Sequence, residues 1–414
     1  MTTAARTVEQ QLAHVLSHVA PTPVEERPLA DAGGRTLREA IRAAVDIPVF
    51  DNSAMDGFAV RFADVGAATA ESPVTLRVVA DLPAGTDLDP VLGAGEAARI
   101  MTGSPVPASA DAIVPFEDTA GGLADSLREV VVQRAPRSPG VHIRRRAVDA
   151  AVGAEIVPPG TLLGPLQLAA AAAAGVPHVR VARPPRVAIV STGSELVAAG
   201  QPLRRGQIPE SNGLLLAALA DDAGADVVLR TTVDDEDASF LAALAAASAA
   251  GAEIVITSGG VSAGAFEVVK NALRGSEVAF TSVAMQPGKP QGFGRLADGA
   301  LLFGLPGNPV SSAVSFEVFV RPALLRMQSR ADLHRGVIRL PAASAWRTPP
   351  GRRQYLPAAI DRSDPARWTV RPATAGGSGS HLAGGLARAE AYAVVPAEIE
   401  AVAPGDLVDV MLVS

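Results

Sequence analysis

The chain has 414 residues, of which 48% are hydrophobic, 19% charged and 4% aromatic, and this length predicts two to four domains rather than one core. Its 36 basic and 43 acidic residues leave a formal net charge of −7, which argues against a general nucleic-acid-binding surface. It has no cysteine, which excludes disulfides, thiolate metal sites and cysteine nucleophiles.

The N-terminal segment predicts a soluble protein whose first element is a helix. Residues 1–10 lack the basic-then-apolar layout of a signal peptide, and no apolar run reaches about 18 residues. We therefore expect a cytoplasmic protein. Residues 7–19 have the spacing of an amphipathic helix, with Thr7 and Gln10 in capping-box positions.

Two further segments precede the most regular part of the chain. From about 46 to 132, short β-type runs alternate with Gly, Pro and Asp turns, which predicts a β-rich module. Residues 147–180 are rich in Ala and Leu with Pro and Gly between them. Their composition predicts a helical connector rather than a separate core.

From residue 186 to about 326, predicted strands alternate with predicted helices. The strands are 187–190, 226–233, 253–257 and 301–305, and the helices follow Asn212, span 236–249, and begin near Ala265 and Pro309. Asn212 is predicted to cap the first of these helices. This alternation indicates a mostly parallel sheet with helices on both faces. The tail from about residue 340 is β-like and predicts a further module.

Ligands of an open parallel sheet bind beyond the carboxyl ends of its strands. The residues that follow the four predicted strands are small, hydroxylated or acidic, as a crevice for phosphate and metal requires. They are Thr192, Gly193, Ser194 and Glu195; Asp234 and Asp235; Ser258, Gly259, Gly260 and Ser262; and Gly304, Pro306, Gly307, Asn308 and Pro309.

Each glycine turn alone is more typical of an ordinary strand-to-helix connection than of an anion site. None has the GKS or GKT of a P-loop or the spacing of the dinucleotide fingerprint. Gly259 and Gly260 nevertheless allow the backbone to approach an anion closely. Four such turns on one edge favour a binding crevice.

The acids at this edge predict a site for a hard cation such as Mg²⁺, which prefers oxygen ligands. They are Glu195, Asp234 and Asp235. A structural alternative applies above all to Asp235, which can cap the helix that begins near Glu236. Lys289, one of only two lysines in the chain, is expected to neutralise substrate phosphate, although both lysines can also be incidental.

Three segments outside the predicted sheet carry further polar groups. Residues 50–60 contain Ser53 and Asp56, and residues 99–107 contain Thr102 and Ser104. Residues 143–149 place three consecutive arginines (144–146) beside Asp149. An arginine triplet is either a solvated face or a bidentate clamp for an oxyanion. The six histidines show no metal-type spacing.

The motifs DNSAMDGFAV, MTGSPVPASADAIVPFED, IRRRAVD, STGSEL, TSGGVSAG, PGKP and GLPGNPVSS occur in this order between Asp51 and Ser312. Together they resemble the molybdopterin molybdenumtransferases, the family that includes bacterial MoeA and the E domain of gephyrin. The tail also fits the last domain of that family, so the resemblance covers nearly the whole chain.

The resemblance implies a multidomain α/β plus β fold. A discontinuous helical and extended domain is expected at 1–46 plus 147–182, and a β-rich domain is inserted at 47–146. A doubly wound, mostly parallel sheet domain follows at 183–328, and a β-barrel-like domain at 329–414. The family is homodimeric with its active site between subunits. The implied reaction inserts molybdenum from molybdate into adenylylated molybdopterin and releases AMP, with Mg²⁺ assisting.

The resemblance also implies roles for particular residues. Catalytic roles fall to Asp56, Asp149, Glu195 and Asp234, of which Glu195 and Asp234 also hold the metal. Substrate binding falls to Thr102, Arg144, Pro306 and Pro309 by motif position, and to Arg352 and Ser380 in the tail by a shorter match. Gly259, Gly260, Ser262 and Lys289 are expected to complete the anion site.

This chain departs from the family pattern near the expected site. Ala265 replaces an acid that the family commonly has, while Glu267 keeps the other, and Gln286 and Ser282 stand where some members have Lys. Two other functions stay open. The chain can be a non-catalytic scaffold of the same fold, or the adenylyltransferase of the preceding step, although the β-rich insert argues against the latter.

Overall fold

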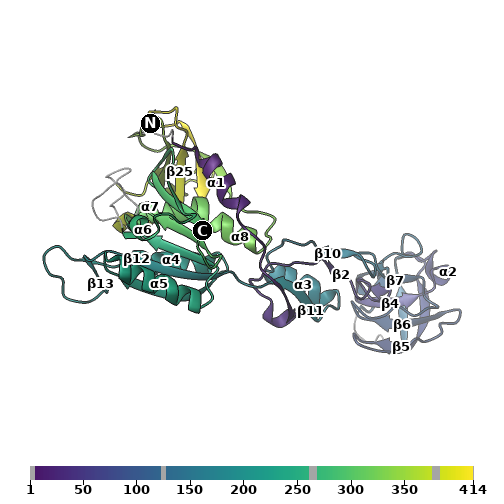
Figure 1. The fold of residues 1–414 in the computed structure, drawn as a ribbon. Helices are drawn as coiled ribbons and strands as arrows, with labels where there is room; N and C mark the ends of the chain where they lie inside the picture. Colours follow the sequence, from purple (N-terminus) through teal and green to yellow (C-terminus); the bar gives the residue numbers. More distant parts are fainter. Residues whose placement is uncertain (1–4, 123–126, 261–267, 375–382, 414) are drawn as a thin grey trace.

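The computed structural model describes residues 5–122, 127–260, 268–374 and 383–413 of the chain. Figure 1 shows an elongated molecule with an α/β lobe (184–328) and a C-terminal sheet (337–412) at one end. A β-rich lobe (47–149) lies at the other end, and a narrow middle region (24–46 with 150–182) joins the two. No helix in the described ranges has the length and hydrophobicity needed to cross a bilayer.

The N-terminal helix forms as its capping pattern predicts. Helix α1 (Val8–Ser17) begins after Thr7, whose hydroxyl accepts the Gln10 amide hydrogen, while the Gln10 side chain accepts from the Thr7 amide. Its buried residues Val8 and Val15 join the core of the α/β lobe rather than that of the middle region, which follows in sequence.

The middle region has a small core of its own, so the prediction of a coreless helical connector was wrong. Two antiparallel pairs build it with helix α3 (Pro165–Ala173) and the 3₁₀ turn η1 (Leu29–Asp31): β1 (Val24–Pro28) with β11 (His178–Ala182), and β2 (Ile41–Arg42) with β10 (Glu155–Val157). Leu37 and Leu163, from the two separate chain segments, are both fully buried in that core.

The β-rich lobe is built on one five-stranded sheet of order β7-β4-β6-β5-β8. Its elements are β3 (Asn52–Ser53), β4 (Gly57–Val60), α2 (Phe62–Val65), β5 (Val74–Leu82), β6 (Glu96–Ile100), β7 (Ala112–Pro115), η2 (Phe116–Asp118), β8 (Glu129–Val132) and β9 (Ile143–Arg144). Short β3 pairs with β9 outside the sheet, which brings the residues before Asp56 beside the arginine triplet.

The α/β lobe contains the predicted parallel sheet, in the order β15-β12-β16-β20-β19-β17. The first four strands are parallel to one another. Strand β19 pairs antiparallel with both β20 and β17, and neither β19 nor β17 was predicted. The strands are β12 (Arg186–Thr192), β15 (Asp226–Val233), β16 (Ile254–Ser258), β17 (Ala279–Ser282), β19 (Pro290–Arg295) and β20 (Leu301–Leu305), with β13 (Leu196–Val197) and β14 (Ile208–Pro209) paired separately.

Helices cover both faces of this sheet, which confirms the doubly wound prediction. One face packs on α4 (Asn212–Asp222), α7 (Pro309–Ser315), the π-helical turn η3 (Phe316–Val320) and α8 (Arg321–Met327). The other packs on α5 (Asp237–Ala249) and α6 (Val268–Ala272). Ile189 faces the first layer and Val190 the second, as alternation along a strand requires.

The C-terminal sheet borrows one strand from the α/β lobe. Its order is β18-β23-β25-β27-β21, with β24 paired to β23 and β22 to β26. The elements are β18 (Met285–Gln286), β21 (Val337–Pro341), β22 (Trp346–Arg347), β23 (Arg353–Asp361), β24 (Thr369–Pro372), η4 (Ala383–Arg388), β25 (Ala391–Val395), β26 (Ala401–Val402) and β27 (Leu407–Leu412). Because β18 pairs with the start of β23, the residues around Arg352 are fixed against the α/β lobe.

Candidate active site

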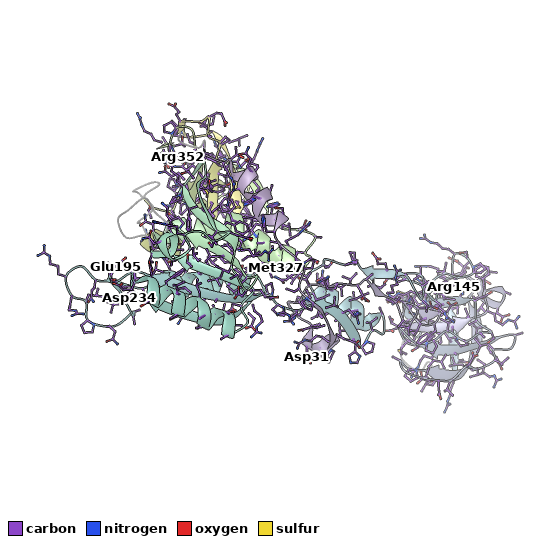
Figure 2. All side chains as sticks on the ribbon, in the orientation of Figure 1. Asp31, Arg145, Glu195, Asp234, Met327 and Arg352 are labelled. Atoms are coloured by element: carbon purple, nitrogen blue, oxygen red, sulfur yellow. The ribbon has the colours of Figure 1, made fainter. Side chains whose placement is uncertain are left out.

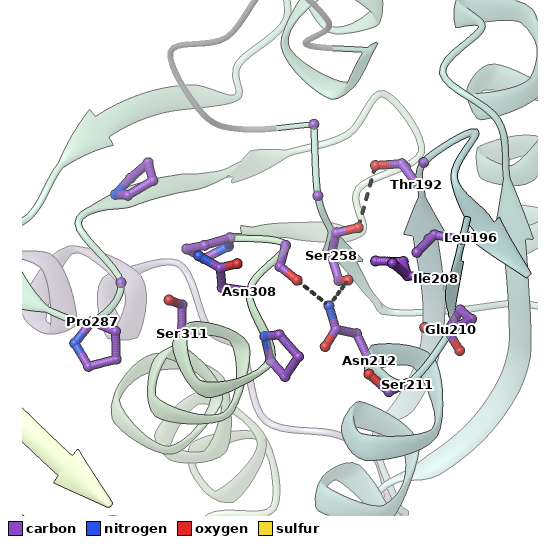
Figure 3. Close-up of a pocket in the computed structure, with 18 of the residues that line it drawn as sticks. Thr192, Leu196, Ile208, Glu210, Ser211, Asn212, Ser258, Pro287, Asn308 and Ser311 are labelled. Atoms are coloured by element: carbon purple, nitrogen blue, oxygen red, sulfur yellow. Dashed lines mark hydrogen bonds between the residues drawn. The ribbon is translucent and has the colours of Figure 1, made fainter. Parts of the chain in front are cut away.

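A pocket of about 920 Å³ opens at the carboxyl edge of the parallel sheet. Its walls are the turns after β12, β16 and β20, the start of α4, the β13–β14 pair, and the segment from Met285 to Pro290 (Figure 3). Arg352 closes it from the C-terminal sheet. The carboxyl-edge crevice predicted from the sequence is therefore present.

The glycine turns pack backbone against backbone. Gly259 has φ +98°, and a Cβ there would lie 2.6 Å from the Thr192 carbonyl oxygen. Its N–H donates to the Leu305 carbonyl at 3.1 Å, and a Cβ on Gly307 would lie 3.5 Å from the Gly259 Cα. Only glycine permits the conformation and the close approach at residue 259, whereas the contact at Gly307 is an ordinary van der Waals distance. The turns after β12, β16 and β20 are thereby held as one surface.

Asn212 joins two of these turns through its side chain. Its Nδ2 donates to Ser258 Oγ at 2.9 Å and to the Gly307 carbonyl at 2.6 Å, and Figure 3 shows both bonds. The predicted helix cap was wrong, because Asn212 is the first residue of α4 and Ser211 precedes it as the cap without a side-chain bond. Helix capping and loop bridging favour the same residue type, so the sequence did not separate them.

Glu210 is a pocket residue that the sequence analysis missed. Its carboxylate accepts the Ser191 hydroxyl at 2.9 Å and the Gly213 amide at 2.7 Å. It therefore bridges the end of β12 and the first turn of α4. Its place directly after β14, three residues before a helical glycine, resembled an ordinary turn in the sequence.

Two carboxylates stand in the turns on the β15 side of the pocket, but not the expected pair. Glu195 lines the pocket and lies over Gly193, where a Cβ would approach its Oε2 to 2.6 Å. Asp235 lines it too: its Oδ2 accepts the Ser194 amide at 2.9 Å, and its own amide donates to Ser194 Oγ at 3.2 Å.

Asp234 is outside the pocket lining, although Figure 2 shows it in the turn beside Glu195. Its Oδ1 accepts the Glu236 amide at 3.3 Å, and α5 begins at Asp237 with Glu236 as its cap. In the structure Asp234 makes the turn contact at the helix start and Asp235 lines the pocket, whereas the sequence favoured a capping role for Asp235. The metal role expected for Asp234 stays a prediction. The described residues contain no group of three or more His, Asp and Glu poised for a metal ion.

Basic groups also line the pocket. Lys289 and Arg352 both line the pocket, as do Pro306 and Pro309. An Arg352 amino group donates to Gln286 Oε1 at 3.1 Å, so Gln286, where the family often has Lys, accepts from the arginine rather than repelling it. Of the other expected anion-site residues, Gly259 and Gly260 line the pocket. Ser262, Ser380, Ala265 and Glu267 lie outside the described residues.

The expected residues of the β-rich lobe lie far from this pocket within one chain. Figure 2 places Arg145, the centre of the arginine triplet, in that lobe at the opposite end from Glu195. Asp56 Oδ1 accepts the amide and hydroxyl hydrogens of Thr102 at 2.7 and 2.8 Å. The amide bond, followed by the hydroxyl bond, lowers the pKa of Asp56 below its ordinary value and keeps this exposed carboxylate ionised near neutral pH.

All three arginines of the triplet are exposed, but two of them are held in ion pairs. Arg145 pairs with Asp51 at 2.6 Å, and Arg146 pairs with Asp46, so these two guanidiniums serve the local fold. Arg144 is exposed on β9, opposite Asn52. The Asp149 side chain is exposed as well, and its amide donates to the Ile47 carbonyl. Arg144 therefore remains available to a ligand.

These observations define a class: an α/β protein with an anion-type pocket at the carboxyl edge of its sheet. Residues 188–326, which contain the pocket, match the family described as a probable molybdopterin binding domain. Residues 6–175 match the MoeA N-terminal region (domain I and II), and residues 339–413 match the MoeA C-terminal region (domain IV).

Similarity to individual proteins extends over the whole chain. The sequence is 44% identical to molybdopterin molybdenumtransferase 2 of Mycobacterium tuberculosis, over 91% of this chain and 92% of that protein. It is 39% identical to the molybdopterin molybdenumtransferase of a Nostoc species, over 72% and 67%. A crystal structure of the MoeA protein of Pyrococcus horikoshii superimposes with a TM-score of 0.79 at 31% identity, covering 99% of both chains. The chain belongs to the molybdopterin molybdenumtransferase (MoeA) family.

Proposed function

We propose that this protein is an enzyme of molybdenum cofactor biosynthesis that inserts molybdenum from molybdate into adenylylated molybdopterin and releases AMP. The observation that carries the proposal is the pocket itself, whose lining combines Lys289 and Arg352 with Glu195, Asp235 and turns built from glycine. An anionic, nucleotide-tagged substrate needs such a mixture of cationic side chains and free backbone amides. The pterin dithiolene supplies the sulfur ligands, so a chain without cysteine suits this chemistry.

The donor set fits Mg²⁺ as an assisting ion. Mg²⁺ is usually held by one or two carboxylates together with substrate phosphates and water rather than by a closed protein cage. Glu195 and Asp235 provide two carboxylates on one side of the pocket, and Asp234 lies in the same turn as Asp235. A bound Mg²⁺ supplies charge neutralisation at the pyrophosphate.

Residues of the chain itself would position the substrates in the pocket. Lys289 and Arg352 attract and orient the anionic ends of the substrates, and the rigid glycine turns fix where a phosphate oxygen can lie. Gln286, on β18, accepts a hydrogen bond from the Arg352 guanidinium and so holds it in place. Molybdate, a tetrahedral oxyanion, suits the guanidinium fork of Arg352.

Release of AMP is the direct test of this function. Purified protein incubated with adenylylated molybdopterin, molybdate and Mg²⁺ should release AMP and yield a molybdenum-loaded pterin, and omitting Mg²⁺ should slow the release. The measurement is AMP by chromatography and molybdenum by elemental analysis. No AMP under any of these conditions would support the scaffold function, and formation of adenylylated product from ATP and molybdopterin would support the adenylyltransferase.

We further propose that the protein is a homodimer in which the β-rich lobe of one subunit completes the pocket of the other. Within one chain, Asp56 and Thr102 are in the lobe opposite Glu195, yet they form a hydrogen-bonded pair on an exposed surface, with the pKa of Asp56 lowered by those bonds. A ligand-binding role for this pair therefore needs a second copy of the chain.

Mixing two inactive variants tests this shared site. If Asp56 and Glu195 of different subunits form one site, heterodimers of Asp56→Asn and Glu195→Gln contain one doubly altered and one intact site. Statistical mixing should then restore about a quarter of wild-type AMP release. Each variant mixed with itself is the control. No recovery, despite heterodimers shown by mass spectrometry, would mean that both residues serve the same chain's site.

A further inference from the structure

The Ser258 hydroxyl occupies a defined place at the centre of the pocket. Ser258 is the last residue of β16, is 2% exposed, and lines the pocket directly before Gly259. Its Oγ lies 2.9 Å from Asn212 Nδ2, and the same nitrogen lies 2.6 Å from the Gly307 carbonyl oxygen. Figure 3 shows Asn212 between these two partners.

The direction of these hydrogen bonds follows from chemistry alone. A backbone carbonyl only accepts, so the atom of Asn212 that contacts Gly307 must be the amide nitrogen. That nitrogen has two hydrogens, of which one goes to Gly307 and the other to Ser258. Ser258 Oγ is therefore an acceptor in this pair, and its own hydrogen points elsewhere.

No hydrogen bond donated by that hydroxyl is found among the residues that the structure describes. The surroundings favour an anion as its acceptor. Gly259 and Gly260 follow in left-handed conformations, and Lys289 lines the same pocket. A hydroxyl whose lone pair is occupied by a fixed donor is a well-oriented donor to a negatively charged oxygen.

We propose that Ser258 binds the substrate by donating its hydroxyl hydrogen to a phosphate oxygen, and that Asn212 is the positioning residue that aims this hydroxyl. The identity of the phosphate-bearing substrate rests on the proposed function. The binding contact itself does not, because any ligand with a pyrophosphate group meets the same donor.

The chain offers a matched control one residue earlier. Thr257 also has a hydroxyl at the end of β16, but it is fully buried, its Oγ1 has no hydrogen-bond partner, and it does not line the pocket. Replacing Thr257 with Val removes a hydroxyl of the same strand while keeping the side-chain shape. Loss of an unpartnered buried hydroxyl should leave stability equal or higher.

Inorganic pyrophosphate, titrated calorimetrically into the full-length protein, is the first test. Ser258→Ala should weaken its binding by about 10- to 100-fold, the worth of a hydrogen bond to a charged group. Its melting temperature should fall modestly, because the buried Asn212 amide loses one acceptor, and the titration is therefore run at a temperature at which the variant is fully folded. Thr257→Val should bind as the wild type does. Equal affinity of Ser258→Ala and wild type, or no pyrophosphate binding by the wild type, would overturn the proposal. Pyrophosphate binding without AMP release would leave it standing while the proposed function fails.

A double-mutant cycle tests the role of Asn212. If Asn212 acts through Ser258, Asn212→Ala should weaken pyrophosphate binding in the wild-type background but add little in the Ser258→Ala background. Full additivity of the two losses would show that Asn212 serves only the turn at Gly307, and would overturn its positioning role. Melting temperatures of all four proteins separate this coupling from loss of folded protein.

Discussion

Replacing Glu195 with Gln should lower the rate of AMP release by about 100- to 1,000-fold, the size of effect expected when one preorganised charge is removed from an active site. Glu195 stands in the turn after β12, lines the pocket, and lies against Gly193, where a Cβ would come within 2.6 Å of its Oε2. Gln has the same shape, so the turn should keep its geometry. The loss should therefore appear in the reaction and in its Mg²⁺ requirement, with little change in melting temperature.

The neighbouring acids provide the controls for this prediction. Asp235 lines the pocket, whereas Asp234 holds the Glu236 amide outside it. Asp235→Asn should therefore reduce AMP release more than Asp234→Asn does. The measurement is the initial rate across a Mg²⁺ titration for all three variants. Near-wild-type activity of Glu195→Gln would contradict the assigned role, and a larger loss in Asp234→Asn would restore the pair expected from the sequence.

Replacing Gly259 with Ala should abolish most pyrophosphate binding and destabilise the protein. The residue has φ +98°, and a Cβ would approach the Thr192 carbonyl oxygen to 2.6 Å and Thr192 Oγ1 to 2.8 Å. Backbone strain of this kind costs about 1–3 kcal/mol, and relief of the clash must separate the turns after β12 and β16. The turns form the pocket floor, so binding and melting temperature should fall together.

An alanine substitution at Gly275 provides a control that distinguishes backbone strain from steric crowding in Gly259→Ala. It too has a left-handed conformation, with φ +86°, but no atom lies within 4 Å of its hypothetical Cβ. Gly275→Ala should therefore show the strain alone, with pyrophosphate affinity preserved. Calorimetric titration and thermal unfolding of both variants provide the comparison. Equal behaviour of the two alanine variants would mean that the close packing of the turns does not shape the pocket.

The sequence predicted the parts of the fold that depend on local pattern. Strand and helix alternation located β12, β15, β16 and β20, and strand ends then located the pocket, because parallel strands bring their carboxyl ends to one edge. The antiparallel β17 and β19 were missed. The segment 290–295 contains Pro, Gly and Gly, which signal turns in sequence, yet Gly292 and Gly294 there allow close approach of neighbouring backbone and side chains.

Details that depend on packing between segments distant in sequence could not be predicted from the sequence. The core of the middle region combines Leu37 with Leu163, and neither segment alone has enough apolar periodicity to predict it. Asn212 and Asp235 were both interpreted as helix caps. Asn and Asp are favoured at helix starts, where they bond to the nearby backbone, and the same residue types can instead bond to a different turn, so sequence alone does not distinguish the two roles. The roles of Asp56, Asp149, Thr102 and Arg144 came from the family resemblance and stay predictions.

The strand exchange between lobes limits how this protein can be shortened. Residues 285–286 sit in the chain between two strands of the α/β lobe, yet they hydrogen-bond to residues 353–354 of the C-terminal sheet. Cutting the chain ahead of Val337 removes Arg352 and strips β18 of its partner at once. A truncated version that keeps every glycine turn thus still loses its guanidinium and the backbone support beneath Gln286. Arg352 and the β18–β23 pairing are therefore kept together or lost together when the chain is shortened.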